Sequence, residues 1–392
     1  MTAAAPPTDP PMVDAEPDAP PAAAIAYARA GGLLTIDLDA IAENWRRLRD
    51  TLKPGAQCAG VVKADGYGCG AIPVAKRLFA EGCRVFFVAR AEEGFALKPH
   101  LPDAAVCILD GLLPGLASDY AAARVVPVLS DAAQVEAWTT YCAANEDRPP
   151  AIVHVDTGMN RLGLPVPEAL ALAEEDGAFE AFSDVLLMSH LIISEEADNP
   201  INAAQLKTFQ RLRAAFPEAK ASLANSSGIF LGPHYHFDLA RPGYALYGGN
   251  PTPGKPNPMR HAVQLLARVL QVRTVASAGT VGYGATARIG AGGRVATIAV
   301  GYADGYLRSL SNRGEAWIGP HRAPIIGRVS MDLVTLDVSS VPPEACRIGD
   351  FAELIGAHIG VDDVADRAGT NGYEILTGLG PRYRRAYLGE AE

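Results

Sequence analysis

The chain has 392 residues, of which 49% are apolar and 20% are charged. This length suits two or three domains, or one barrel with a second domain, and the composition is not that of a disordered chain. The formal net charge is −10 and Lys and Arg are not clustered, which disfavours a nucleic-acid scaffold or a binder of anionic membranes.

The N-terminal residues 1–28 are rich in Ala, Pro and Asp, and we expect a disordered extension without a catalytic role. They have neither the basic start nor the apolar stretch of a secretory signal. No apolar run reaches the roughly 18 residues that span a bilayer. The six cysteines are scattered without close pairs, as is typical of a reduced compartment, so we expect a cytoplasmic protein.

A short strand is predicted within residues 32–38, followed by a helix from Asp39, as its N-cap, to about Arg49. Short apolar runs rich in β-branched residues then alternate with amphipathic segments. The predicted strands are 60–64, 85–89, 105–110, 125–130, 151–156, 185–190, 221–225 and about 239–247. The predicted helices are 71–81, 91–97, 112–123, 131–144, 167–175 and 203–215. Such repeated units over 39–250 predict an α/β fold, a closed (β/α)8 barrel of parallel strands.

The sequence changes character after Gly249. Residues 250–258 contain four prolines and predict a linker. Beyond them, little helical periodicity remains, and the predicted strands are 263–275, 294–300, 315–327, 330–338 and 350–355. We therefore expect a second, mainly β domain over 259–392, which the strand at 32–38 joins because it precedes the first barrel helix.

Polar residues follow several predicted barrel strands. Because the carboxyl ends of the strands form the rim where barrel enzymes place catalysis, we expect these residues to converge there. Each residue alone also fits a turn or a satisfied core position. A lysine among apolar neighbours loses proton affinity and becomes a usable nucleophile or base, and glycine-flanked strand ends can cradle a phosphate. The candidates are Lys63, Arg161, His190, Asn225, Ser226 and Arg241.

The chain contains, in this order, the motifs VVKADGYG, HVDTGMNRLG, ANS, RPGYALYG, GYGAT, GYADGY and GRVSMD. With these motifs it resembles the alanine racemase family over residues 32–388. The resemblance implies a barrel that binds pyridoxal 5′-phosphate (PLP), a C-terminal β domain, and interconversion of L-alanine and D-alanine. It also implies a homodimer whose active sites are completed by the partner subunit, and in bacteria a supply of D-alanine for peptidoglycan.

The resemblance assigns catalytic roles to four residues. Lys63 matches the lysine that carries PLP, and Tyr283 matches the tyrosine that the other subunit supplies. Two such groups on opposite faces of a planar adduct can remove a proton on one face and return it on the other. His190 matches the histidine that helps to set this tyrosine. Arg241 matches the arginine at the pyridine nitrogen, where a guanidinium keeps its proton and favours proton return over transamination.

The resemblance also implies binding roles and two departures from the family pattern. Tyr67, Asn225, Ser226, Gly243 and Tyr244 fall at the cofactor, Arg161 and the Met331 backbone at the substrate carboxylate, and Tyr302 at the entrance of the site. Many members carry a carbamylated lysine that supports this arginine, and His154 stands there instead. Pro381 replaces a tyrosine that often binds phosphate, with Tyr373 or Tyr383 as candidate substitutes.

Other functions stay open at this point. The same architecture serves racemases of broader specificity, for example for serine, and PLP decarboxylases, although Arg241 and Tyr283 argue against a decarboxylase. A non-catalytic PLP carrier would end near the close of the barrel, whereas this chain continues for more than 130 residues. His234 and His236 form a pair without a third ligand nearby, so no metal site is predicted.

Overall fold

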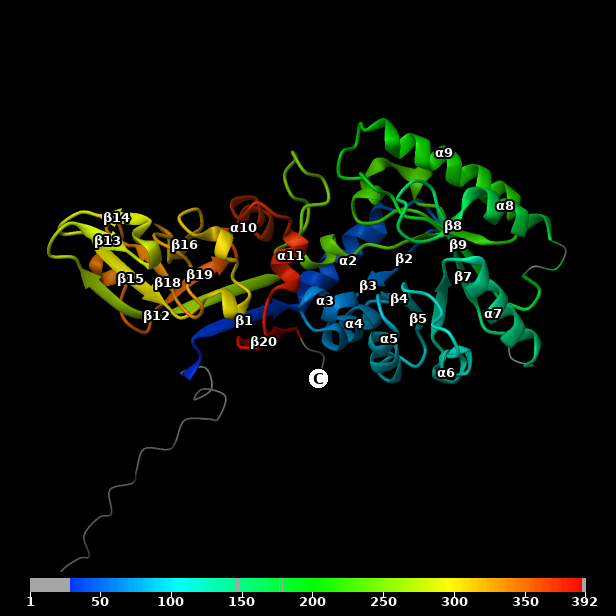
Figure 1. Cartoon of the computed structure of the whole chain (residues 1–392), viewed down its shortest axis with the longest axis horizontal. Coiled ribbons are helices and arrows are strands. Elements are labelled where there is room, and N and C mark those ends of the chain that lie inside the picture. The colour runs from blue at the N-terminus through cyan, green and yellow to red at the C-terminus, as the bar shows by residue number, and fades with distance from the viewer. Residues whose placement is uncertain (1–28, 146–147, 176, 178, 390–392) are drawn as a thin grey trace, which may run out of the picture.

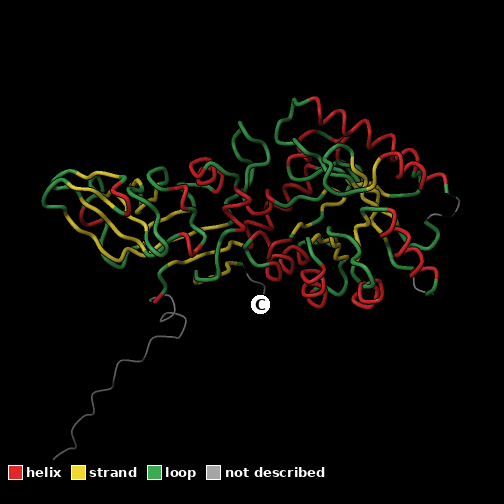
Figure 2. The backbone as a smooth tube through the Cα atoms, in the orientation of Figure 1, coloured by secondary structure: helices red, strands yellow, loops and turns green. Residues whose placement is uncertain are grey.

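The computed structural model describes residues 29–145, 148–175, 177 and 179–389. The predicted disordered extension, residues 1–28, lies outside this range. A barrel of strands and helices forms one end of the molecule and a mainly β part forms the other (Figure 1). Figure 2 shows the contrast, with helices around the strands of the barrel and mostly strands and loops at the opposite end.

The described residues form a barrel of eight parallel strands, which confirms the predicted fold. The first strand consists of β2 (Gln57–Cys58) and β3 (Gly60–Val61), interrupted at Ala59. The others are β4 (Val85–Val88), β5 (Ala105–Ile108), β6 (Val126–Leu129), β7 (Ala151–Asp156), β9 (Val185–Met188), β10 (Lys220–Ser222) and β11 (Leu239–Ala240). The barrel closes because β11 pairs in parallel with β2, while the Asp238 N–H donates to the Ala221 carbonyl at 2.9 Å beside β10.

Helices cover the outside of the barrel close to their predicted positions. They are α4 (Ala71–Ala80), α5 (Ala91–Leu97), α6 (Ala117–Ala123), α7 (Ala132–Ala143), α8 (Val166–Glu174) and α9 (Pro200–Ala215). Strands such as β6 are buried at every residue, as expected of parallel strands covered on both faces. Only α6 begins clearly later than predicted, because Pro114 and Gly115, which has φ +78°, form a turn before it.

Four predicted boundaries were wrong, and three of them matter near the site. The first helix, α2 (Leu38–Thr51), is capped by Asp37, whose side chain accepts from the Ala40 N–H at 2.8 Å, and Asp39 lies in its first turn. The first barrel strand ends at Val61, so Lys63 does not close a strand but begins the short helix α3 (Lys63–Tyr67). Strands β9 and β11 end before His190 and Arg241, which lie in the loops that follow.

The C-terminal part is built on a sheet with the strand order β17-β16-β19-β12-β1-β20. Its central strand β12 (Val263–Thr274) pairs with β1 (Gly32–Asp37), which also pairs in parallel with β20 (Arg384–Leu388). Strands β15 (Arg294–Ile298) and β18 (Val334–Asp337) extend the sheet from β12, and β19 is Phe351–Ile355. The predicted strand 315–327 is instead a hairpin of β16 (Glu315–Ile318) and β17 (His321–Pro324), which turns at Gly319 with φ +55°.

Besides strand β20, sequence reasoning gave no range for four elements of this part. The hairpin of β13 (Gly279–Val281) and β14 (Ala287–Ile289) lies at the end of the molecule farthest from the barrel (Figure 1). Helices α10 (Val361–Ala368) and α11 (Gly372–Thr377) lie between the sheet and the barrel. These two helices matter because they contact the rim of the barrel where the polar residues gather.

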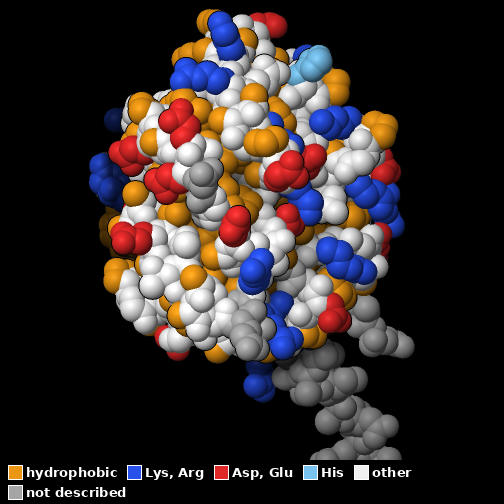
Figure 3. Space-filling view, turned by 90° about the vertical axis from the view of Figure 1, so that its right-hand side faces the viewer, with side chains coloured by type: hydrophobic (Ala, Val, Ile, Leu, Met, Phe, Trp, Pro, Cys, Tyr) orange, Lys and Arg blue, Asp and Glu red, His pale blue; other side chains and the backbone are white. Residues whose placement is uncertain are grey.

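Three further observations concern the charges on the surface, the cysteines and the length of the helices. Basic and acidic side chains are interspersed on the barrel face seen in Figure 3. All six cysteines are buried and free. Within the described residues, no helix is both long enough and apolar enough to cross a membrane.

Candidate active site

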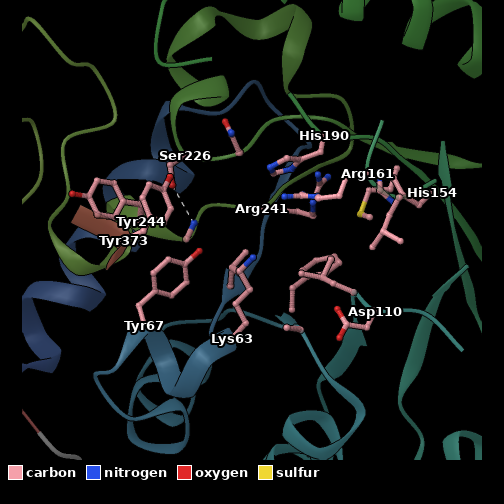
Figure 4. Close-up of a pocket in the computed structure, with 18 residues that line it drawn as sticks. Lys63, Tyr67, Asp110, His154, Arg161, His190, Ser226, Arg241, Tyr244 and Tyr373 are labelled. Carbon is pink, nitrogen blue, oxygen red and sulfur yellow. Dashed lines mark hydrogen bonds between the residues drawn. The ribbon is translucent and has the colours of Figure 1, made fainter. Parts of the chain in front are cut away.

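A cavity of about 360 Å³ opens at the carboxyl ends of the barrel strands. Most of the predicted site residues line it, namely Lys63, Tyr67, Arg161, His190, Asn225, Ser226, Arg241, Gly243 and Tyr244. In Figure 4, Lys63 points between a group of tyrosines with Ser226 on one side and a group of arginines and histidines on the other. A cavity of this size can bury most of a small organic ligand.

The segment after Lys63 has an unusual backbone. Residues 64–68 all have φ between +52° and +76°, so the chain makes one left-handed turn. Residues with a side chain cost about 1–2 kcal/mol each in this conformation, which requires other contacts to hold it. The Ala64 N–H donates to Glu93 Oε1 at 2.6 Å, the Ala71 N–H donates to Asp65 Oδ1 at 2.9 Å, and Arg385 donates to the Gly68 carbonyl at 2.5 Å.

This turn sets the position and the chemistry of the Lys63 amine. Burial, assisted by the positive charge of Arg161, lowers the pKa of Lys63 below its usual value, although the carboxylates of Glu93 and Asp110 oppose the shift. The amine therefore gives up its proton more easily than a lysine in water. A neutral amine in a cavity can act as a nucleophile or a base.

Two backbone amides and a hydroxyl converge on one side of the cavity. Ser226 Oγ accepts from the N–H groups of Gly243 at 3.1 Å and Ala245 at 3.2 Å. A Cβ atom on Gly243 would lie 2.3 Å from Tyr67 Oη, so only glycine fits there. The Tyr67 ring cannot easily move because it stacks on Tyr247 with ring centroids 4.7 Å apart. The two amides thus hold the Ser226 hydroxyl beside a glycine backbone, and such a cradle suits a phosphate group.

The side chain of Tyr244 lines the cavity and also contacts the C-terminal helices. Its hydroxyl donates to Asp362 Oδ1 at 2.6 Å, in helix α10, and its ring stacks on Tyr373 with centroids 4.3 Å apart. Tyr244 thus ties the barrel rim to the C-terminal helices, and only its backbone remains to serve the cradle. Of the two candidate substitutes for the phosphate-binding tyrosine, Tyr373 lines the cavity and Tyr383 does not.

The other side of the cavity carries an excess of positive charge. Arg241 donates to the Ser189 carbonyl at 2.6 Å and to the Ser222 hydroxyl, which fix its guanidinium. Burial lowers the pKa of Arg241 to about 10, so it remains a cation at neutral pH. With Arg161 it outnumbers the one lining carboxylate, Asp110, and the cavity therefore favours anionic ligands.

Both lining histidines are neutral at physiological pH. Burial and the charge of Arg241 lower the pKa of His154 to about 4 and that of His190 to about 3. His154 Nδ1 lies 3.5 Å from Ser130 Oγ. Neutral imidazoles can donate or accept hydrogen bonds beside the arginines without adding charge repulsion.

The loop that presents Arg161 is held by a carboxylate rather than by His154. Asp156 accepts from the backbone N–H groups of Gly158, Met159 and Asn160, each at 2.7 Å. These bonds fix the tight turn between β7 and Arg161.

Three predicted site residues lie away from this cavity. Tyr283 is 72% exposed, Met331 54% and Tyr302 43%, and all three belong to the C-terminal part. The N–H groups of Tyr302 and Ala303 donate to the carbonyls of Ser330 and Met331 at 3.0 and 2.9 Å, so these two loops lie side by side. One chain therefore does not bring Tyr283, Tyr302 or Met331 to the Lys63 cavity.

Sequence reasoning missed several residues that line the cavity. They are Val61, Phe87, Ala89, Leu109, Asp110, Leu162 and Met188. Asp110 could have been found, because it directly follows the apolar run of a predicted strand, as the other candidates do. Within the described residues, no group of three His, Cys, Asp or Glu side chains is placed to hold a metal ion.

The fold and the cavity define a barrel enzyme in which a lysine amine works beside an anion cradle. Comparison with known proteins identifies the family of this enzyme. Residues 36–251 match the family model of the alanine racemase N-terminal domain, and residues 262–387 match that of the C-terminal domain. The chain belongs to the alanine racemase family and is a racemase.

Individual relatives are similar over nearly the whole chain. The alanine racemase of Rhodospirillum rubrum is 50% identical over 365 residues, which are 93% of this chain and 98% of the relative. A catabolic alanine racemase of Mesorhizobium japonicum is 49% identical over 93% of this chain and 95% of its own length. The crystal structure of alanine racemase from Bartonella henselae with covalently bound pyridoxal phosphate has a TM-score of 0.87 and 39% identity, and covers 92% of this chain and 100% of that one.

Proposed function

We propose that the protein interconverts L-alanine and D-alanine with PLP as its cofactor. The observation that carries this proposal is the Lys63 amine, with its lowered pKa, in a cavity between the Ser226–Gly243 cradle and Arg241. The family membership of the whole chain supports the substrate.

The lining residues fit PLP by their chemistry. The hydroxyl of Ser226, held by the amides of Gly243 and Ala245, suits its phosphate, Arg241 suits its ring nitrogen, and Lys63 suits its covalent attachment. When bound, PLP supplies an electron sink that makes the α-hydrogen of an attached amino acid acidic. The proposed PLP-binding domain comprises residues 39–250, and residues 259–392 form the second domain.

Two groups of the protein would then move the proton. The Lys63 amine takes or returns it on one face of the substrate, which its lowered pKa favours. The Tyr283 phenol of a second copy of the chain acts on the opposite face. Arg161, held by the Asp156 turn, binds the substrate carboxylate. His190 stands beside the partner's tyrosine in this arrangement.

A homodimer follows from this assignment. It is supported by the exposure of Tyr283, Tyr302 and Met331, which are large side chains of the C-terminal part and do not line their own cavity. In a dimer, they would complete the cavity of the partner, with the Met331 backbone at the substrate carboxylate and Tyr302 at the entrance. Burial of these side chains would also remove apolar surface from water.

We further infer that the D-alanine supplies peptidoglycan synthesis in the cytoplasm. The cytoplasmic location is supported by the six free, buried cysteines, since thiols persist in a reducing compartment. Disruption of the gene should then make growth depend on added D-alanine. Growth without D-alanine in the absence of any other racemase would contradict this role.

The racemase activity is tested by following the loss of optical rotation in a solution of each alanine enantiomer. Purified protein with PLP should racemise L-alanine and D-alanine at comparable efficiency, and Lys63→Ala should abolish both reactions. Serine, tested in parallel, measures how broad the specificity is. Release of carbon dioxide without racemisation would favour a decarboxylase, and PLP binding without any turnover would favour a carrier.

The two-sided mechanism has its own test in deuterated water. Tyr283→Phe removes the acid and base of one face only, so deuterium should enter the α-position from one enantiomer much faster than from the other. Equal deuterium incorporation from both enantiomers would refute the assignment of Tyr283.

A further inference from the structure

A buried amide lies behind the cavity and contacts the loops of two site residues. Gln205, on helix α9, is 2% exposed. Its Nε2 donates to Thr157 Oγ1 and to the His190 carbonyl, both at 3.0 Å, and its Oε1 accepts from the Ile192 N–H at 3.0 Å. Both N–H bonds of the amide and its oxygen are thus used.

The contacts of this amide continue to Arg241. Thr157 Oγ1 lies 2.8 Å from Ser189 Oγ, and the Ser189 carbonyl accepts from Arg241 at 2.6 Å. Thr157 is also the residue after Asp156, at the start of the turn that presents Arg161. One chain of hydrogen bonds, buried at Arg241 and half-buried at Thr157, therefore joins the three segments that carry His190, Arg241 and Arg161.

We propose that Gln205 is a positioning residue that fixes the His190 loop relative to the Arg161 loop, with Thr157 as the link between them. This inference rests on the proposed function of those residues. A side chain needed only to pack α9 on the barrel could be apolar, since burying an amide costs free energy unless its hydrogen bonds are made. The amide instead donates to the carbonyl of His190, which lines the cavity, and to the hydroxyl of Thr157, the residue after Asp156.

Two isosteric changes separate positioning from packing. Gln205→Glu keeps the shape but removes both N–H donors, and Gln210→Glu on the exposed side of the same helix is its matched control. Thr157→Val keeps the shape but removes the hydroxyl, and Thr157→Ser restores it. Each holoenzyme is assayed for kcat and KM with L-alanine, and each apoprotein for its dissociation constant for PLP by fluorescence quenching.

The expected changes differ between the two sites. Gln205→Glu should lower kcat at least about tenfold and weaken PLP binding about fivefold, because the His190 loop loses its anchor, as expected for the loss of a buried hydrogen bond. Thr157→Val should mainly raise KM, by about threefold or more, because the Arg161 loop loosens. Thr157→Ser and Gln210→Glu should stay within about twofold of wild type.

The inference is overturned if Gln205→Glu and Thr157→Val change only the unfolding midpoint and leave kcat, KM and PLP binding like those of Gln210→Glu. If Gln205→Glu does not fold, the Thr157 pair decides, since a KM unchanged in Thr157→Val also refutes the link. Failure of the wild type to racemise alanine would refute the proposed function instead, and the PLP-binding comparison would still test Gln205.

Discussion

Gly68→Ala should disturb the left-handed turn that follows Lys63. Gly68 has φ +76°, and a Cβ atom there would lie 2.3 Å from the Leu376 carbonyl oxygen, closer than the 3.0 Å that real Cβ atoms respect. The obstacle is backbone of helix α11 and cannot rotate away. The left-handed conformation costs alanine about 1 kcal/mol, and the clash adds about 1–3 kcal/mol, so we expect about 2–4 kcal/mol in all.

Gly115→Ala is the matched control, because Gly115 has φ +78° but open space where the Cβ would go. It should cost only the backbone penalty of about 1 kcal/mol. Urea unfolding at fixed protein and PLP concentrations measures both variants, and racemase kinetics follow the Lys63 amine. Gly68→Ala should lose about tenfold or more in kcat/KM, since a small displacement of a reacting group is costly. Equal stability and activity of the two variants would refute the reasoning.

Three further changes probe other parts of the site. Asp156→Asn should raise KM for L-alanine about tenfold with a smaller change in kcat, because the turn before Arg161 loses its charged acceptor; an unchanged KM would exclude this support. Asp362→Ala should lower the free energy of unfolding in urea by about 2 kcal/mol and speed the loss of PLP. In a double-mutant cycle, the effects of Asp362→Ala and Tyr244→Phe on the free energy of unfolding should not add. Additive effects would show that the bond between the two side chains contributes nothing. Stability should also depend on pH through His190, because burial lowers its pKa in the folded protein to about 3, whereas its ordinary pKa is near 6.5. As pH falls from 6.5 toward 3, only the unfolded chain takes up this proton, so the free energy of unfolding decreases. Unfolding midpoints that fall just as steeply with pH in His190→Gln would contradict this.

The barrel could be predicted because its strands leave a strong signal. Parallel strands covered on both faces are continuously apolar, as in Val126–Leu129, and helical patterns separate them. The rim residues could then be placed by a single rule, that they follow strand ends. The same rule would have reached Asp110. The boundaries of the elements could be predicted less well. Asp37 and Asp39 are both suitable N-caps, and only the end of β1 decides between them.

The parts that escaped prediction depend on contacts distant in sequence. Local propensity opposes a left-handed turn at Ala64, Asp65 and Tyr67, and Arg385, which helps to hold it, is 317 residues away from Gly68. The bond from Tyr244 to Asp362 spans 118 residues and crosses from the barrel to helix α10, whose extent the sequence pattern did not indicate. In the proposed dimer, Tyr283 meets Lys63 of the other copy, a contact that the pattern of one chain does not indicate.

Mixing two inactive variants is the most direct test of a site built from Lys63 of one copy and Tyr283 of another. Lys63→Ala and Tyr283→Ala dimers, dissociated together and allowed to reassociate, should form heterodimers in which one site carries both substitutions and the other carries neither. Random pairing then predicts recovery of about a quarter of the wild-type racemase activity. No recovery above the sum of the separate variants would contradict a shared site.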